Sequence, residues 1–118
     1  MNESPGPTIN AGNVSRERRS VERYGLIAHA EIFEPTSGVR ITGRISEISR
    51  KGCYVDLLNT LPVETLVDLL VTRDAGVLIT RARIIYTQEG MGLGLAFLDM
   101  AEDQLAILDG WIAELKGG

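Results

Sequence analysis

Polar and apolar residues alternate along most of the chain between Tyr24 and Leu98. Short segments rich in Gly, Pro, Asp and Ser interrupt the alternation, as is typical of turns. A period of two predicts strands that bury one face and expose the other. The predicted strands cover about 24–33, 39–46, 53–57, 67–71, 77–86 and 91–98, and the segment 47–52 is a predicted turn.

The period changes near the C-terminus, where an amphipathic helix is predicted over 100–116. Asp99 and Glu102 have the spacing of a capping box in acidic form, so the helix is expected to begin near Met100 and to end at Gly117. Its apolar stripe, with spacings of three and four, is formed by Leu105, Leu108, Ile112 and Leu115.

These elements predict a mainly β fold, a small six-stranded antiparallel barrel of the split-barrel type with a C-terminal α-helix. Because no helices alternate with the strands, a parallel βαβ fold is not expected. The polar, Pro- and Gly-containing segment 1–15 is predicted to be a flexible tail. One domain is predicted over 16–118, with a charged hinge at 16–23 and the barrel at 24–98.

The composition argues against several classes of protein. A net charge of −4 and a pI of about 5.0 leave no global basic field for nucleic acid or a membrane surface, and aromatics for base stacking are few at 5%. Cys53 and His29 are the only residues of their types, so neither a disulfide nor a multi-Cys/His zinc site is expected. No set of residues suggests an enzyme or a bound metal.

The N-terminal residues lack the pattern of a signal peptide, and no apolar run approaches the roughly 20 residues that span a bilayer. We therefore expect a cytoplasmic protein without membrane insertion.

The first candidate motif is Arg19-Ser-Val-Glu-Arg23. The two arginines lie on one face of either a helix or a strand, and a guanidinium group can donate two parallel hydrogen bonds to a phosphate. Arg18 adds positive charge beside them. The alternative interpretation is an ordinary solvated basic segment.

The second candidate motif is Glu47-Ile-Ser49-Arg-Lys-Gly52. The Ser49 hydroxyl can donate and accept, the Glu47 carboxylate can accept from guanine-type N–H groups, and Gly52 lets a ligand approach the backbone. The alternative is a plain turn, in which Ser and Gly are common for local reasons.

Together the two motifs resemble the PilZ family, whose signature is RxxxR followed by [DN]xSxxG at the turn between the second and third strands. The resemblance covers about 16–115, and Gly52-Cys-Tyr-Val55 and Gly92-Leu-Gly94-Leu-Ala-Phe97 are also similar to the family. It implies a receptor for the bacterial second messenger cyclic di-GMP, with no other cofactor.

The resemblance also implies roles for individual residues. Arg19 and Arg23 would hold the phosphates and a guanine, Ser49 would bond the ligand, and Gly52 would leave room for it. An arginine at the position of Arg18 accompanies, in the family, binding of a stacked dimer of the dinucleotide.

One residue departs from the signature, because Glu47 stands where the family has Asp or Asn. Its side chain is one methylene longer, so the alternative function is a PilZ-like adaptor that has lost or weakened nucleotide binding. As a receptor, the protein is expected to pass the signal to an unknown downstream protein through ordering of the N-terminal arginine segment. Ligand stoichiometry and oligomeric state stay open, a homodimer included.

Three further features have structural interpretations. The glycines of Gly90-Met-Gly92-Leu-Gly94 lie inside a strand pattern, so they are expected to permit a bulge or close packing and not to form a phosphate loop. Cys53 is expected to be a buried structural thiol. Trp111 is expected to pack against the barrel.

Overall fold

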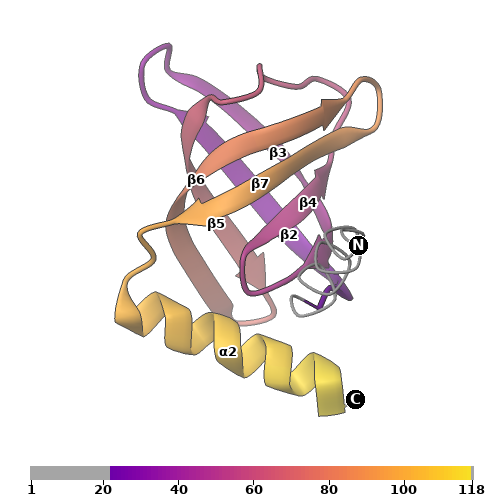
Figure 1. Ribbon diagram of the computed structural model, residues 1–118, viewed down its shortest axis with the longest axis vertical. Coiled ribbons are helices and arrows are strands. Elements are labelled where there is room, and N and C mark those ends of the chain that lie inside the picture. The colour runs from indigo at the N-terminus through magenta and orange to yellow at the C-terminus, as the bar shows by residue number, and fades with distance from the viewer. Residues whose placement is uncertain (1–21, 118) are drawn as a thin grey trace, which may run out of the picture.

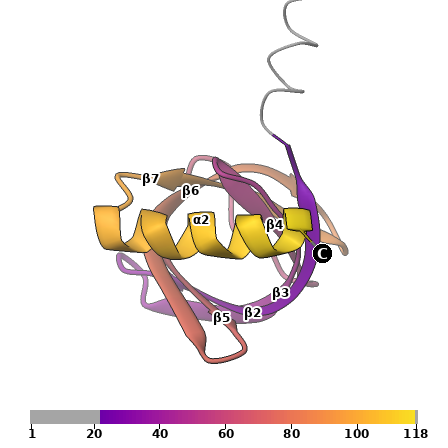
Figure 2. The same ribbon diagram turned by 90° about the horizontal axis from the view of Figure 1, so that it is seen from below.

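The computed structural model describes residues 22–117. In this part of the chain, six antiparallel strands form a closed barrel in the order β2-β3-β4-β7-β6-β5, and the helix α2 lies across one end of it (Figures 1 and 2). The predicted fold is confirmed. The elements are β2 (Tyr24–Glu34), β3 (Val39–Ile48), β4 (Gly52–Asp56), β5 (Leu66–Arg73), β6 (Gly76–Gln88), β7 (Gly92–Leu98) and α2 (Glu102–Gly117).

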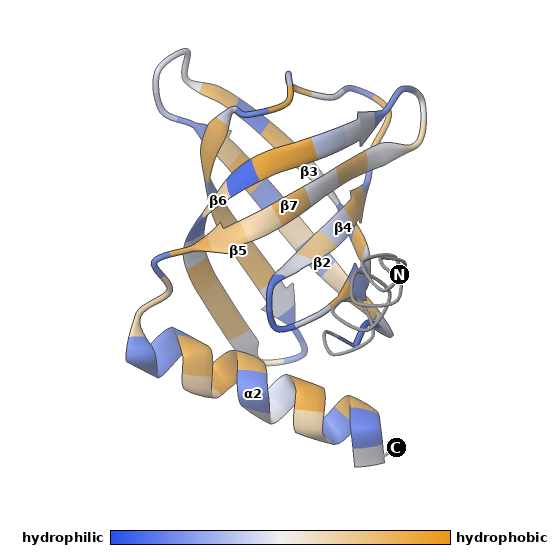
Figure 3. Ribbon diagram, in the orientation of Figure 1, coloured by the Kyte–Doolittle hydropathy of each residue, from blue (hydrophilic) through white to orange (hydrophobic). Residues whose placement is uncertain are grey.

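The core lies inside the barrel, because each strand directs alternate side chains inward. Hydrophobic and hydrophilic residues accordingly alternate along the ribbons in Figure 3. Burial of apolar surface stabilises the fold by roughly 25 cal/mol per Å² removed from water. Strands from all around the barrel, together with α2, contribute fully buried side chains, which include Ile32, Ile45, Val55, Leu69, Ile84, Leu93 and Leu108.

Helix α2 closes one end of the barrel. Its Leu108 and Trp111 are buried, which confirms the predicted packing of the tryptophan. The guanidinium of Arg73 lies 5.9 Å from the centre of the Trp111 ring, and its Nη1 is 2.7 Å from Oε1 of Glu114. The Ile79 N–H donates to Oε1 of Gln104 at 2.7 Å, so the helix also satisfies a backbone group of β6.

Several predicted boundaries were off by one or two residues, and two of them concern the site and the helix. Strand β3 continues to Ile48, so Glu47 belongs to the strand and not to the turn. The register between β3 and β4 is irregular between Ile45 and Glu47, and this irregularity interrupts the alternation from which the strand was predicted. Helix α2 begins at Glu102, and Asp99, the first residue of the predicted capping box, has a φ of 49°. An N-cap residue needs an extended backbone, whereas this left-handed residue turns the chain out of β7.

The predicted tail 1–15 and most of the predicted hinge 16–23 lie outside the described residues, as do Arg18 and Arg19. Among the helices of the described part, none is long and apolar enough to cross a membrane.

Candidate functional site

The β3–β4 turn is organised by the hydroxyl of Ser49. Its Oγ accepts the N–H groups of Lys51 at 3.1 Å and Gly52 at 3.2 Å, and it donates to the Gly52 carbonyl at 3.3 Å. The Ser49 N–H donates to the same carbonyl at 2.8 Å. A hydroxyl has one donor and two acceptor sites, so these bonds use its full capacity. The serine therefore shapes the turn, the local role that the alternative interpretation of the motif gave it.

Gly52 is required by the neighbouring strand. A Cβ atom placed on it would lie 2.0 Å from the carbonyl oxygen of Leu95 in β7, which no side chain can tolerate. Its φ is not in the left-handed region, in contrast to those of Gly38 and Gly90. Close approach of two strands thus accounts for the glycine, and room for a ligand would be an additional role.

Arg23 and Glu47 lie next to each other at the surface. Nη1 of the arginine is 3.6 Å from Oε1 of the glutamate, and their side chains are 61% and 44% exposed. Glu47 is held in β3 opposite Gly25 of β2 and Tyr54 of β4. Solvent screens an ion pair with this exposure, so it contributes little to stability and can open for a ligand at small cost.

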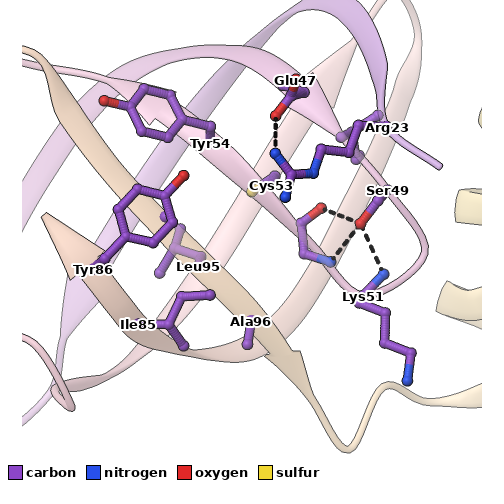
Figure 4. A pocket seen from close by; sticks show the side chains of 13 residues that line it. Arg23, Glu47, Ser49, Lys51, Cys53, Tyr54, Ile85, Tyr86, Leu95 and Ala96 are labelled. Atoms are coloured by element: carbon purple, nitrogen blue, oxygen red, sulfur yellow. Dashed lines mark hydrogen bonds and ion pairs between the residues drawn. The ribbon is translucent and has the colours of Figure 1, made fainter. Parts of the chain in front are cut away.

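These residues line one cavity of about 340 Å³, within the range of small-molecule sites of roughly 300–1,000 Å³. It opens on the outer side of the barrel, over β3, β4, β7 and β6 (Figure 4). The structure therefore brings together four of the six predicted site residues. The lining residues are Arg23, Glu47, Ile48, Ser49, Lys51, Gly52, Cys53, Tyr54, Ile85, Tyr86, Gly94, Leu95 and Ala96.

The cavity has two chemically different ends. Arg23 and Ser49 lie at one end, and the rings of Tyr54 and Tyr86 lie together at the other (Figure 4). The ring centres are 6.0 Å apart, with an angle of 31° between the planes. Tyr54 lies in the segment Gly52-Cys-Tyr-Val55 that is similar to the family, but neither tyrosine was predicted to be a site residue. The sequence signal that could have found them is the glycine pair of β7, which lies between their strands.

The tyrosine end is neutral at physiological pH. Burial, followed by the nearby Tyr86 and Asp56, raises the pKa of Tyr54, so its phenol stays protonated. The Tyr54 hydroxyl donates to Oε1 of Gln88 at 2.5 Å. This end of the cavity therefore offers aromatic surface without charge.

The thiol of Cys53 is buried, as predicted, and burial raises its pKa to about 12. It is therefore a protonated thiol at neutral pH and a poor nucleophile. Among residues 22–117, no group of three His, Cys, Asp or Glu side chains could hold a metal ion.

Arg50, in the same turn, is directed to the helix. Its Nε and Nη2 lie 2.8 and 3.1 Å from Oδ1 and Oδ2 of Asp109 in α2, a bidentate pair. The carbonyl of Lys51 accepts the Phe97 N–H at 2.8 Å near the end of β7. The turn that borders the cavity is thus tied to two other elements.

The described residues thus form a small closed barrel with a two-ended cavity on its outer surface. The model of the PilZ domain matches residues 17–114, so the chain belongs to the PilZ domain family. The predicted family is confirmed. No curated protein is significantly similar to this chain.

Solved structures share the fold, two PilZ domains among them. The PilZ domain of YcgR from Escherichia coli, solved with c-di-GMP, has a TM-score of 0.71 at 16% identity, over 84% of this chain and 92% of that one. The PilZ domain of CeSA from a cellulose-synthesizing bacterium has a TM-score of 0.60 at 23% identity, over 81% and 96%. The inhibitor of motility MotI/DgrA from Bacillus subtilis has a TM-score of 0.66 at 19% identity, over 82% and 51%.

Proposed function

We propose that this protein is a receptor for cyclic di-GMP that passes the signal to a partner protein. The observation that carries the proposal is the cavity itself, in which residues of both motifs meet. Membership of the PilZ family supports it, as does the similar domain of YcgR, which was solved with c-di-GMP. The ligand is bound and not chemically altered.

The polar end of the cavity suits the anionic backbone of a cyclic dinucleotide. The Arg23 guanidinium stays charged at any physiological pH and can bond a phosphate with two parallel N–H groups. Lys51 brings a second cation to the same cavity. Arg19, and Arg18 beside it, would add further guanidinium groups from the N-terminal segment, as the family motif implies.

Glu47 would accept hydrogen bonds from guanine N–H groups, the role of the family's shorter Asp or Asn. In the structure its carboxylate is already close to Arg23. A ligand phosphate would therefore compete with Glu47 for this arginine, and the guanine would take up the carboxylate that is released.

The same ion pair favours the alternative function, a PilZ adaptor with weak or lost nucleotide binding. The Arg23 guanidinium then serves mainly as the partner of Glu47. Replacement of Glu47 by Asp separates the two functions. A marked gain in affinity would indicate a real but weakened site, whereas no binding by either protein would favour the adaptor.

For the relay, we propose that the ligand orders residues 16–23 against the cavity. Arg19 and Arg23 would contact the same ligand, so binding selects conformations in which this segment lies on the barrel. A partner protein that binds better to this state would read the signal.

Isothermal titration with cyclic di-GMP tests the proposal and gives the stoichiometry as well. Arg23→Ala should weaken binding by about 10- to 150-fold, since a charge-assisted hydrogen bond contributes about 1.5–3 kcal/mol. Arg19→Ala should have a similar effect. Arg40→Ala is the matched control, because Arg40 forms an ion pair with Glu31 and does not line the cavity. A folded wild-type protein that gives no binding heat would overturn the proposal.

A further inference from the structure

The two ends of the barrel are covered in different ways. Helix α2 lies across one end, where its Leu108 and Trp111 are buried (Figure 1). Within the described part of the chain, the opposite end is covered only by the β2–β3 turn, the β4–β5 loop and the β6–β7 turn (Figure 1). We call this second end the loop end, and it consists of residues 34–39, 56–65 and 88–91.

Large apolar side chains are exposed at the loop end. Leu58 is 77% exposed, Met91 is 62% exposed and Val39 is 40% exposed. The Leu57 N–H donates to the Met91 carbonyl at 3.1 Å, which joins the β4–β5 loop to the β6–β7 turn. Leu57 and Leu61, in the same loop, are only partly buried against the core. The apolar surface of this end therefore continues from the core to solvent, and hydropathy marks apolar segments among its loops (Figure 3).

The charged side chains of the loop end all have the same sign. They are Glu34, Asp56, Glu64 and Glu89, and these segments contain no lysine or arginine. Glu64 lies 3.7 Å from Nε of Arg83 in β6, whereas Glu89 is exposed in the same turn as Met91. The exposed apolar side chains are thus bordered by carboxylates, and electrostatic complementarity favours a partner with cationic side chains.

We propose that the loop end is a docking surface for a basic amphipathic helix of a partner protein. The apolar side chains of that helix would cover Leu58 and Met91, and its lysines or arginines would face the carboxylates. An apolar centre with a polar rim is the usual composition of such an interface. The inference goes beyond the proposed function, because it does not require a bound nucleotide.

The charge of the loop end disfavours two other occupants. A second copy of this chain, in a symmetric contact, would bring its own carboxylates against the same carboxylates. An anionic membrane surface attracts basic segments and would be repelled by this end. A basic segment of a different protein meets neither obstacle.

Fluorescence anisotropy with the full chain and labelled synthetic peptides tests the proposal. The probe is an amphipathic peptide of leucine and lysine with roughly four helical turns, and glutamate replaces lysine in the comparison peptide. The lysine peptide should bind at least about 10-fold more tightly than the glutamate peptide. The double variant Leu58→Ser, Met91→Ser should bind the lysine peptide about 10- to 100-fold more weakly, because two apolar side chains are no longer buried.

Matched controls separate this surface from general attraction to an acidic protein. Ile27→Ser should leave binding unchanged, because Ile27 is 80% exposed but lines a cavity with Leu115 of α2, at the other end of the barrel. Glu89→Gln should weaken binding by about 1.5- to 5-fold and reduce its salt dependence. Glu102→Gln, in the exposed first turn of α2, removes the same charge and should have no effect.

Equal binding by the wild type and the double variant would overturn the docking surface, and so would equal losses in the double variant and Ile27→Ser. If the double variant does not fold, the comparison of Glu89→Gln with Glu102→Gln decides the matter, and equal effects would overturn the proposal. Self-association of the wild type in sedimentation velocity that the double variant loses would assign the surface to a second copy, which also overturns it.

The titrations contain no nucleotide, so their outcome is separate from that of the proposed function. A wild type that binds neither peptide would overturn the docking surface and leave the receptor proposal intact. A wild type that binds the lysine peptide but not cyclic di-GMP would support the docking surface and overturn the receptor alone.

Discussion

The turns before and after β3 are built on the same principle, yet they have different surroundings. In the β2–β3 turn the Glu34 carboxylate accepts the N–H groups of Thr36 and Ser37, each at 2.8 Å. In the β3–β4 turn the Ser49 hydroxyl accepts two N–H groups in the same manner. Each side-chain oxygen thus accepts backbone N–H groups that have no partner in the sheet where the strands end.

The neighbours of the two turns differ. The Glu34 turn is exposed, and its glycine, Gly38, has open space around it. Ser49 is buried, Gly52 touches the backbone of β7, and Arg50 reaches α2. Local hydrogen bonds are therefore enough to form a turn. The contacts of Gly52 with β7 and of Arg50 with α2 are what make the second turn part of the candidate site.

The largest expected effect comes from the glycines. Gly52→Ala should destabilise the protein by about 3 kcal/mol or more, because its Cβ would overlap the Leu95 carbonyl and move a strand. Gly38→Ala should cost about 1–2 kcal/mol, the strain of a φ of 79° without any clash. Urea unfolding measures both. Equal losses would contradict the difference between the turns.

The serines come next. Ser49→Ala should cost about 1–3 kcal/mol, since it leaves two N–H groups in a partly buried turn without their acceptor. Ser37→Ala, in the exposed turn, should cost less than about 1 kcal/mol because water replaces the lost bonds. A Ser37→Ala loss as large as that of Ser49→Ala, in the same unfolding assay, would show that burial does not separate the turns.

The two turns should also differ in their response to pH. Hydrogen bonds from Ser37 and Thr36 lower the pKa of Glu34 to about 2, below the value of about 4.3 of an unfolded chain. The carboxylate therefore contributes stability that is complete above about pH 4.5 and is lost as the pH falls through about 2. The difference in urea midpoint between wild type and Glu34→Gln should shrink between about pH 6 and pH 3. A constant difference would contradict the lowered pKa.

The smallest effect is expected at the ion pair that links the site turn to the helix. A double-mutant cycle of Arg50→Ala and Asp109→Ala should give a coupling energy of about 0.2–1 kcal/mol that decreases in high salt. The looser Arg40–Glu31 pair, at 3.4 Å, serves as the control and should give less. No coupling at low salt would show that the turn is not held by α2.

The barrel was predictable because strand alternation is local. Val67, Leu69 and Val71 are apolar at every second position, and all three are buried. The helical stripe was predictable for the same reason, whereas the boundaries at Glu47 and Asp99 were not. A bulge and a left-handed residue depend on where the next element lies in space, and residue type alone does not specify this position.

The candidate site was predictable only in part. Its motifs marked Arg23, Glu47, Ser49 and Gly52, which lie together in the cavity, and their roles toward a ligand stay a prediction. Neither Tyr54 nor Tyr86 was predicted to be a site residue, although Tyr54 lies in the family-like segment Gly52-Cys-Tyr-Val55. They meet because β4 and β6 both pair with β7, and this pairing is a property of the closed barrel.

The sequence by itself determined most of the core positions and where most strands run, since both depend on local periodicity, and its resemblance to the PilZ family marked the polar residues of the candidate site. The tertiary structure alone decided that Gly52 and Gly94 yield space to Leu95 and Tyr86 and that Arg50 faces the helix. These are contacts between distant segments, and their geometry exists only once the barrel has closed.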